Sequence, residues 1–145
     1  MSEANKVIVR RSFEEVWNKR NLTIIDEIYA ADYIGHVVAS PEIIRGAEGL
    51  KRFAAIFQFT FPDIYFIIED QIAEGSKVAS RWIVHGTQGD ELISAGSKGE
   101  LVTLTGISIQ QITSGKIVES WDHWDALRLL QGMTRDVFEQ LSVGI

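Results

Sequence analysis

The sequence predicts an α+β protein in which helices cover one face of a curved antiparallel sheet. Apolar residues recur at helical spacing before residue 60, whereas β-branched and aromatic residues dominate after Pro62. Helices that precede the strands, rather than alternate with them, are typical of α+β proteins. The chain has 145 residues, so we expect a single domain over residues 1–145.

Two helices are expected near the N-terminus. The first spans about 3–19 and places apolar residues, including Phe13 and Trp17, on one face. Asn21 suits the N-cap of a short second helix that ends at Tyr29, because its side-chain oxygen can accept a hydrogen bond from the first turn.

The segment 30–45 is predicted to be irregular, because it contains the turn signal Ser40-Pro41. A third helix with one apolar face is expected over 46–59. It ends before Pro62, because proline disfavours the helical conformation in the residue that precedes it.

Strands follow the helices and are expected to form an antiparallel meander. Two short connections contain a glycine, Gly75 or Gly115, which permits a tight turn. The polar segment 89–100 is predicted to be a long loop or an irregular edge hairpin, and 127–143 a helical tail. The predicted strands are 64–73, 77–87, 101–113 and 117–126.

Composition and missing motifs exclude several classes of protein. The net charge of −6 opposes nucleic acid or an anionic membrane as partner, and no apolar run is long enough to span a bilayer. The absence of cysteine and of a signal peptide predicts a cytoplasmic protein. Three histidines without ligand spacing and no glycine-rich phosphate loop predict neither a metal site nor a nucleotide cofactor.

The densest group of reactive side chains is ESWDHWD at 119–125, within the last predicted strand. Side chains alternate along a strand, so this segment has two faces. The first face consists of residues 118, 120, 122 and 124, and the second of residues 117, 119, 121, 123 and 125. Burying the second face would bury three ionisable groups, which is costly unless each is paired. We therefore expect Asp122, Ser120 and Trp124 to point inward, and Trp121 to face outward, where it could pack against a partner subunit.

Asp122 is the candidate general acid/base. A carboxylate between apolar walls has a raised pKa, which suits proton transfer next to a carbonyl. The alternative is a solvated residue at a strand end, or an ion pair with Arg81. His36 is either a proton shuttle at the cavity mouth or an ordinary loop histidine.

A small-molecule pocket is expected between the helices and the concave face of the sheet. Aromatic residues of the helical half could form its wall, although each could equally be ordinary core. Arg81 could stabilise an anion in the pocket or form ion pairs outside it, while Trp82 shares the opposite face of its strand. The candidate wall residues are Trp17, Phe53, Phe57, Phe59 and Phe61.

Several motifs together resemble the SnoaL-like polyketide cyclases, also called predicted ester cyclases. They are DYIGHVV at 32–38, RGAEGLKRF at 45–53, FPD at 61–63, GKIVE at 115–119 and the W-D pair that precedes the LLQG tail. This resemblance covers nearly the whole chain. It implies the cone-shaped nuclear-transport-factor-two-like (cystatin-like) fold, and a homodimer or higher oligomer that forms through the sheet.

The resemblance also implies a reaction. In characterised members, an aspartate late in the last long strand acts as general acid/base in an aldol ring closure, without metal or cofactor. Asp122, directly after Trp121, resembles that aspartate, and His36 resembles a pocket-facing histidine of the family. Ser108 and Ser120 occupy positions where some cyclases carry supporting histidines, which is a departure from the family pattern.

Three functions remain open at this level. The first is cofactor-independent acid/base chemistry on a small apolar or polycyclic carbonyl compound, by ring closure, isomerisation or elimination. The second is a non-catalytic binding protein that uses the same pocket. The third is a structural dimerisation module with a vestigial cavity, which a cavity filled by core side chains would favour.

Overall fold

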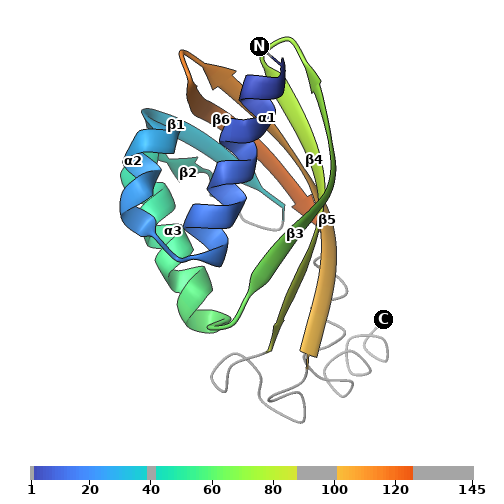
Figure 1. The fold of residues 1–145 in the computed structure, drawn as a ribbon. Coiled ribbons are helices and arrows are strands. Elements are labelled where there is room, and N and C mark those ends of the chain that lie inside the picture. Colours follow the sequence, from blue (N-terminus) through green and yellow to red (C-terminus); the bar gives the residue numbers. More distant parts are fainter. Residues whose placement is uncertain (1, 39–41, 88–100, 126–145) are drawn as a thin grey trace, which may run out of the picture.

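The computed structural model describes residues 2–38, 42–87 and 101–125. Helices occupy the first part of the chain and, apart from two strands between them, precede the sheet, which confirms the predicted α+β fold. Figure 1 shows the three α-helices on one side of a curved sheet. The helices are α1 (Ser2–Arg11), a π-helical continuation (Ser12–Asn18), a 3-10 turn (Leu22–Ile24), α2 (Ile25–Ile28) and α3 (Gly46–Thr60).

The described residues form one six-stranded sheet of order β2-β1-β6-β5-β4-β3. Neighbouring strands are antiparallel except β1 and β6, which are parallel. The strands are β1 (Tyr29–Val37), β2 (Ile44–Arg45), β3 (Tyr65–Glu74), β4 (Lys77–Thr87), β5 (Leu101–Thr113) and β6 (Lys116–Trp124).

The prediction of an irregular segment at 30–45 is wrong, because β1 and β2 lie within or overlap it. Strand β1 pairs with β6, which follows about 80 residues later in the chain, so its hydrogen bonds leave no local signal in the sequence. The expected four-stranded meander is therefore the larger part of a six-stranded mixed sheet. Gly75 and Gly115 adopt positive φ angles of 57° and 77° in the two tight turns that the sequence predicts.

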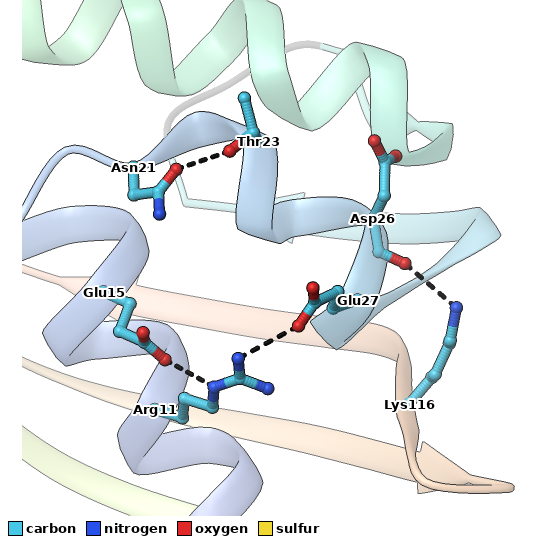
Figure 2. A network of polar contacts seen from close by, with 7 residues as sticks. All are labelled: Arg11, Glu15, Asn21, Thr23, Asp26, Glu27 and Lys116. Carbon is cyan, nitrogen blue, oxygen red and sulfur yellow. Dashed lines mark hydrogen bonds and ion pairs between the residues drawn. The ribbon is translucent and has the colours of Figure 1, made fainter.

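The second helix is shorter than expected, because Tyr29 already begins β1. Asn21 precedes the first turn but makes no capping hydrogen bond to the backbone. Its Oδ1 accepts a hydrogen bond from Thr23 Oγ1 at 2.6 Å instead (Figure 2). The side-chain oxygen of Asn21 therefore bonds Thr23 instead of the backbone N–H that an N-cap residue would bond.

Polar contacts connect α2 to α1 and to the start of β6 (Figure 2). Arg11 of α1 contacts Glu15 one turn later, and its Nη2 donates to Glu27 Oε2 at 3.0 Å. Lys116 Nζ, at the start of β6, donates to the backbone oxygen of Asp26 at 2.9 Å. These contacts hold the short helix between α1 and the sheet.

A bulge in β6 changes the alternation expected from the sequence. Gln111 pairs with Glu119, but Ile112 pairs with Ile117, so Val118 is the additional residue. Ile117 consequently lies fully buried on the inner face, together with Ser120. The expected placement of Val118 rather than Ile117 on the face of Asp122 is wrong for this reason.

The helices pack on the inner face of the sheet, whereas the outer face remains exposed. Three isoleucines of this outer face, Ile72, Ile107 and Ile109, are 70%, 51% and 40% exposed. No helix in the described part of the chain is long and apolar enough to cross a bilayer. The predicted loop at 89–100 and the predicted tail at 127–143 lie outside the described residues.

Candidate functional site

A cavity lies between the helices and the inner face of the sheet. It contains about 730 Å³ of space, including its open mouth, and side chains from the π-helical turn, α3 and all six strands line it. A concave site that is lined mainly by apolar side chains is typical of small-molecule binding. Core side chains do not fill the cavity completely, which was the outcome that would have favoured the third hypothesis.

Aromatic rings form the wall at one end of the cavity. Trp17 meets Phe53 and Phe57 edge-on, with ring centroids 6.3 and 5.9 Å apart. All three line the cavity, as expected from their helical spacing. Phe59 does not line it, because it points to solvent and is 74% exposed, and Phe61 is buried in the core outside this cavity.

Asp122 lies on the inner face of β6 and lines the cavity, opposite Ser108 of β5. Ser108 Oγ donates a hydrogen bond to Asp122 Oδ1 at 2.5 Å, and Trp82 Nε1 donates to Ser108 Oγ at 2.9 Å. Gly106 leaves room for the indole, because a Cβ there would lie 2.4 Å from Trp82 Cζ2. Strand β4 thus orients Ser108, and Ser108 orients the carboxylate.

The surroundings of Asp122 keep its proton affinity high. Burial raises the pKa of Asp122 to about 6, although the hydrogen bond from Ser108 and the electrostatic influence of His123 and His36 oppose the shift. A carboxyl with this pKa is largely ionised at neutral pH and still binds a proton readily. This is the property that a general base near neutral pH requires.

Two tyrosines, absent from the candidates taken from the sequence, also line the cavity. The rings of Tyr29 and Tyr33 are perpendicular at 4.9 Å, and the Tyr29 hydroxyl shares a hydrogen bond of 2.6 Å with Ser12 Oγ. Burial raises the pKa of both phenols, so both are neutral hydrogen-bond donors. Their spacing of four residues would place both on one face of a strand, but the segment that contains Tyr33 was predicted to be irregular.

Glycine at position 35 allows Tyr33 to lie across the sheet. A Cβ on Gly35 would be 2.6 Å from the Tyr33 hydroxyl oxygen. Gly35 pairs with Ser120 of β6, so the phenol lies beside the inner face of that strand. Tyr33 is therefore near the carboxylate, whose charge contributes to the raised pKa of the phenol.

His36 lies on the outer face of the sheet, contrary to the expectation that it faces the pocket. Its Nε2 hydrogen-bonds Glu119 Oε2 at 2.8 Å, and its ring stacks on Trp121 at 5.6 Å. Alternation along β1 explains this, since Tyr33 and Val37 line the cavity and His36 has the opposite orientation. Trp121 faces outward, as the alternation of β6 suggested.

Arg81 also points away from the cavity, so the ion-pair alternative applies and the expected pocket role does not. Its guanidinium contacts Glu69 Oε1 and Asp70 Oδ2, each at 3.0 Å. Both partners belong to β3, and the arginine side chain is 52% exposed. Neither His36 nor Arg81 lines the cavity, so neither is placed to contact a ligand there.

The remaining expected pocket residues, Trp82, Ser108, Ser120 and Trp124, all line the cavity. Gln110 also lines it and was not among the candidates, although it is the inward neighbour of Ser108 on β5. Within residues 2–38, 42–87 and 101–125, no cluster of three His, Cys, Asp or Glu side chains could hold a metal ion.

Solved structures with the same fold provide a comparison. The candidate SnoaL-like polyketide cyclase of Jannaschia sp. CCS1 has a TM-score of 0.83 at 18% identity, and the match covers 92% of this chain and 94% of that one. IdmH, a candidate polyketide cyclase from Streptomyces antibioticus, has a TM-score of 0.79 at 24% identity, with 88% and 96% covered. A candidate polyketide cyclase from Bacillus cereus has a TM-score of 0.74 at 26% identity, with 90% and 80% covered.

A search of curated proteins finds no significant match to this sequence. The family model of the SnoaL-like polyketide cyclases, however, matches residues 7–133. This range contains the cavity and the carboxylate on β6. The chain therefore belongs to the SnoaL-like polyketide cyclase family.

Proposed function

We propose that this protein is a cofactor-independent acid/base enzyme that acts on a small apolar carbonyl compound, by an aldol-type ring closure. The observation that carries the proposal is Asp122 itself. Its carboxylate lines an apolar cavity, receives a hydrogen bond from Ser108, and has a pKa raised to about 6. A cavity-lining carboxyl whose pKa is raised by burial is a candidate for proton transfer with a ligand.

In the proposed reaction, the ionised carboxylate of Asp122 removes a proton from the carbon next to a carbonyl. The electron pair of the broken C–H bond moves into an enolate, and the resulting carbon nucleophile attacks a second carbonyl of the same molecule. A C–C bond forms and the second carbonyl oxygen becomes an alkoxide, which takes the proton back from Asp122. No redox partner is needed, because the ring closure is an isomerisation.

Tyr33 is the proposed donor to the enolate oxygen. With His36 and Arg81 on the outer face, the neutral phenols of Tyr29 and Tyr33 are two candidate donors among the described cavity residues. Tyr29 is already engaged with Ser12, whereas the hydroxyl of Tyr33 lies beside the inner face of β6. A preorganised donor in a site that excludes water stabilises developing negative charge more than water does.

Deuterium exchange at the acidic carbon of ethyl benzoylacetate tests the first step. Asp122→Asn should lower the protein-catalysed exchange rate about 10² to 10⁴-fold, the usual contribution of a general base. Glu119→Gln is the matched control, because Glu119 lies on the outer face of the same strand. It should exchange at nearly the wild-type rate.

The same assay separates the alternatives. If wild type and Asp122→Asn bind the ester but exchange it equally slowly, the protein is a binding protein and not an enzyme. If exchange depends on Asp122 but no ring forms, an isomerase or dehydratase that uses the same enolate becomes the better description. Product analysis by mass spectrometry and NMR distinguishes these two reactions.

We also propose that two copies associate through the outer face of the sheet. The exposed Ile72, Ile107 and Ile109 support this, because exposed apolar side chains gathered on one face are typical of interaction surfaces. Ile109→Asp should produce a monomer in analytical ultracentrifugation. Ile56→Asp is the control, since Ile56 is 68% exposed on α3 and away from the sheet; a monomeric wild type would contradict the proposal.

A further inference from the structure

We infer that Gln110 and Ser120 form a second polar subsite in the cavity, and that this subsite binds a hydroxyl group of the substrate. The inference rests on the proposed function, in which the substrate is a carbonyl compound that gives a proton to Asp122. It adds the chemical class of that substrate: a hydroxylated carbonyl compound, rather than a purely apolar one.

Two buried polar atoms carry the argument. Gln110 and Ser120 are 4% and 2% exposed, and both line the cavity. Among the described residues, Gln110 Oε1 and Ser120 Oγ have no hydrogen-bond partner. The Ser120 hydroxyl lies near Tyr33 and opposes the rise in the pKa of the Tyr33 phenol. The two side chains nevertheless make no hydrogen bond of normal geometry.

These two residues are direct neighbours. Gln110 on β5 and Ser120 on β6 face each other across the antiparallel ladder. Most buried polar side chains in proteins are hydrogen-bonded, because leaving such a group unpaired is costly. Two unpaired groups that face each other on a cavity wall are therefore arranged for something that enters the cavity.

The chemistry of the pair selects a hydroxyl group. A hydroxyl can donate to Gln110 Oε1 and accept from the Ser120 hydroxyl at the same time. A carbonyl oxygen can only accept, so it would leave the glutamine oxygen unpaired. If the amide were turned by 180°, its NH₂ would donate to the hydroxyl oxygen, and the hydroxyl could still donate to Ser120.

The ladder also gives the spacing between the two polar groups of the substrate. Ser108–Asp122 and Gln110–Ser120 are successive inward pairs, two residues apart on each strand. That spacing is about 7 Å. A substrate that reaches both pairs would therefore carry its hydroxyl roughly 7 Å from the carbon that gives up its proton, close to the distance between the phenol oxygen and the acidic carbon of a para-hydroxybenzoylacetate ester.

Binding of two matched esters tests the subsite without requiring catalysis. Ethyl para-hydroxybenzoylacetate and ethyl para-methylbenzoylacetate differ by one hydroxyl in place of a methyl group of similar size. Isothermal titration calorimetry at neutral pH should show wild type binding the hydroxy ester about tenfold more tightly or better, because a methyl group leaves both polar atoms unpaired.

Two variants remove the subsite and one serves as a control. Ser120→Ala and Gln110→Met should each reduce the ratio of the two dissociation constants towards one. Ser80→Ala should keep the wild-type ratio, because Ser80 is equally buried but its Oγ accepts a hydrogen bond from Gln71 outside the cavity lining. Thermal unfolding of all three variants verifies that they are folded.

The outcomes distinguish this inference from the proposed function. A wild-type protein that binds neither ester or does not prefer the hydroxy ester overturns the subsite, as does a preference that Ser120→Ala and Gln110→Met retain. Slow exchange that Asp122→Asn leaves unchanged, with the hydroxyl preference intact, overturns the enzymatic proposal alone. Catalysed exchange without hydroxyl preference overturns the subsite alone.

Discussion

The inner and outer faces of this sheet carry similar residue types in different environments. On the inner face, Asp122 receives a hydrogen bond from Ser108 in an apolar cavity, and burial raises its pKa to about 6. On the outer face of the same strand, Glu119 pairs with His36 at about one-third exposure. Solvent stabilises the charge of the outer carboxylate, so it contributes little to either chemistry or stability.

The tryptophans repeat this contrast. Trp82, on the inner face of β4, is buried and donates through Ser108 towards the carboxylate. Trp121, on the outer face of β6, stacks on His36 and lies under Lys77 Nζ at 5.7 Å. Whether a side chain takes part in chemistry therefore depends on which face of the sheet it points to, rather than on its residue type.

The largest effect is expected from Asp122→Asn on pH-dependent stability. The folded state raises the pKa of Asp122 from an ordinary 3.8 to about 6, so ionisation in the folded protein costs about 3 kcal/mol. Wild type should therefore lose about 3 kcal/mol of unfolding free energy relative to Asp122→Asn as pH rises from about 4 to above 6. Urea denaturation across this range measures the difference.

The outer carboxylate supplies the control for that measurement. Glu119→Gln should keep the loss of stability that wild type shows between the same two limits, because this variant leaves Asp122 in place. An Asp122→Asn profile that is parallel to wild type throughout would mean that the carboxylate is not desolvated. The contrast between the two faces would then be wrong.

A second large effect is expected where the inner face is most crowded. Gly106→Ala would place a Cβ 2.4 Å from the Trp82 ring and 2.8 Å from the backbone oxygen of His123. Displacing either should cost about 1 to 3 kcal/mol of unfolding free energy, as overpacked cores usually do. Thr105→Ala, on the exposed outer face beside it, should cost less; equal losses would contradict the tight inner packing.

Ser108→Ala should change the pH dependence of catalysis. The hydrogen bond from Ser108 lowers the pKa of Asp122 against the effect of burial, so its removal should move that pKa above about 6. The acidic limb of the exchange rate should then shift to higher pH, because the ionised base is the active form. Ser80→Ala, which does not touch the carboxylate, should leave the limb in place.

The smallest effect is expected from Arg81→Met on the outer face. Its ion pairs with Glu69 and Asp70 are exposed in the single chain, so in the monomer their loss should lower the urea midpoint only slightly, and less at high salt than at low salt. The exchange rate should not change. A loss larger than that of Gly106→Ala would show that the outer ion pairs, and not the inner packing, stabilise the sheet.

Local patterns predicted much of the fold. Helix α3, strands β4 and β5 and both glycine turns lie close to their predicted positions. Helical spacing, β-branched runs and turn residues are local properties of the sequence. Asp122 points inward as the cost of burying the opposite face suggested. Strand β1 was missed because its partner lies far away in the chain.

Other features have no strong local signal. The bulge at Val118 arises from pairing with β5, and it alters which residues share a face. The orientation of Arg81 depends on acidic partners in β3, and alternation alone permits either face. The inward position of Tyr33 depends on the strand that replaces a predicted irregular segment.

The sequence by itself determined the fold class, the family motifs and the candidate carboxylate, because each depends on residue types at short and regular spacing. Only the tertiary structure decided which side chains lie next to that carboxylate. Pairing of β1 with β6 brought Tyr33 to the inner face and His36 to the outer one. The pairing of β5 with β6 placed Gln110 opposite Ser120, one step from Asp122, since only a folded ladder aligns residues of different strands.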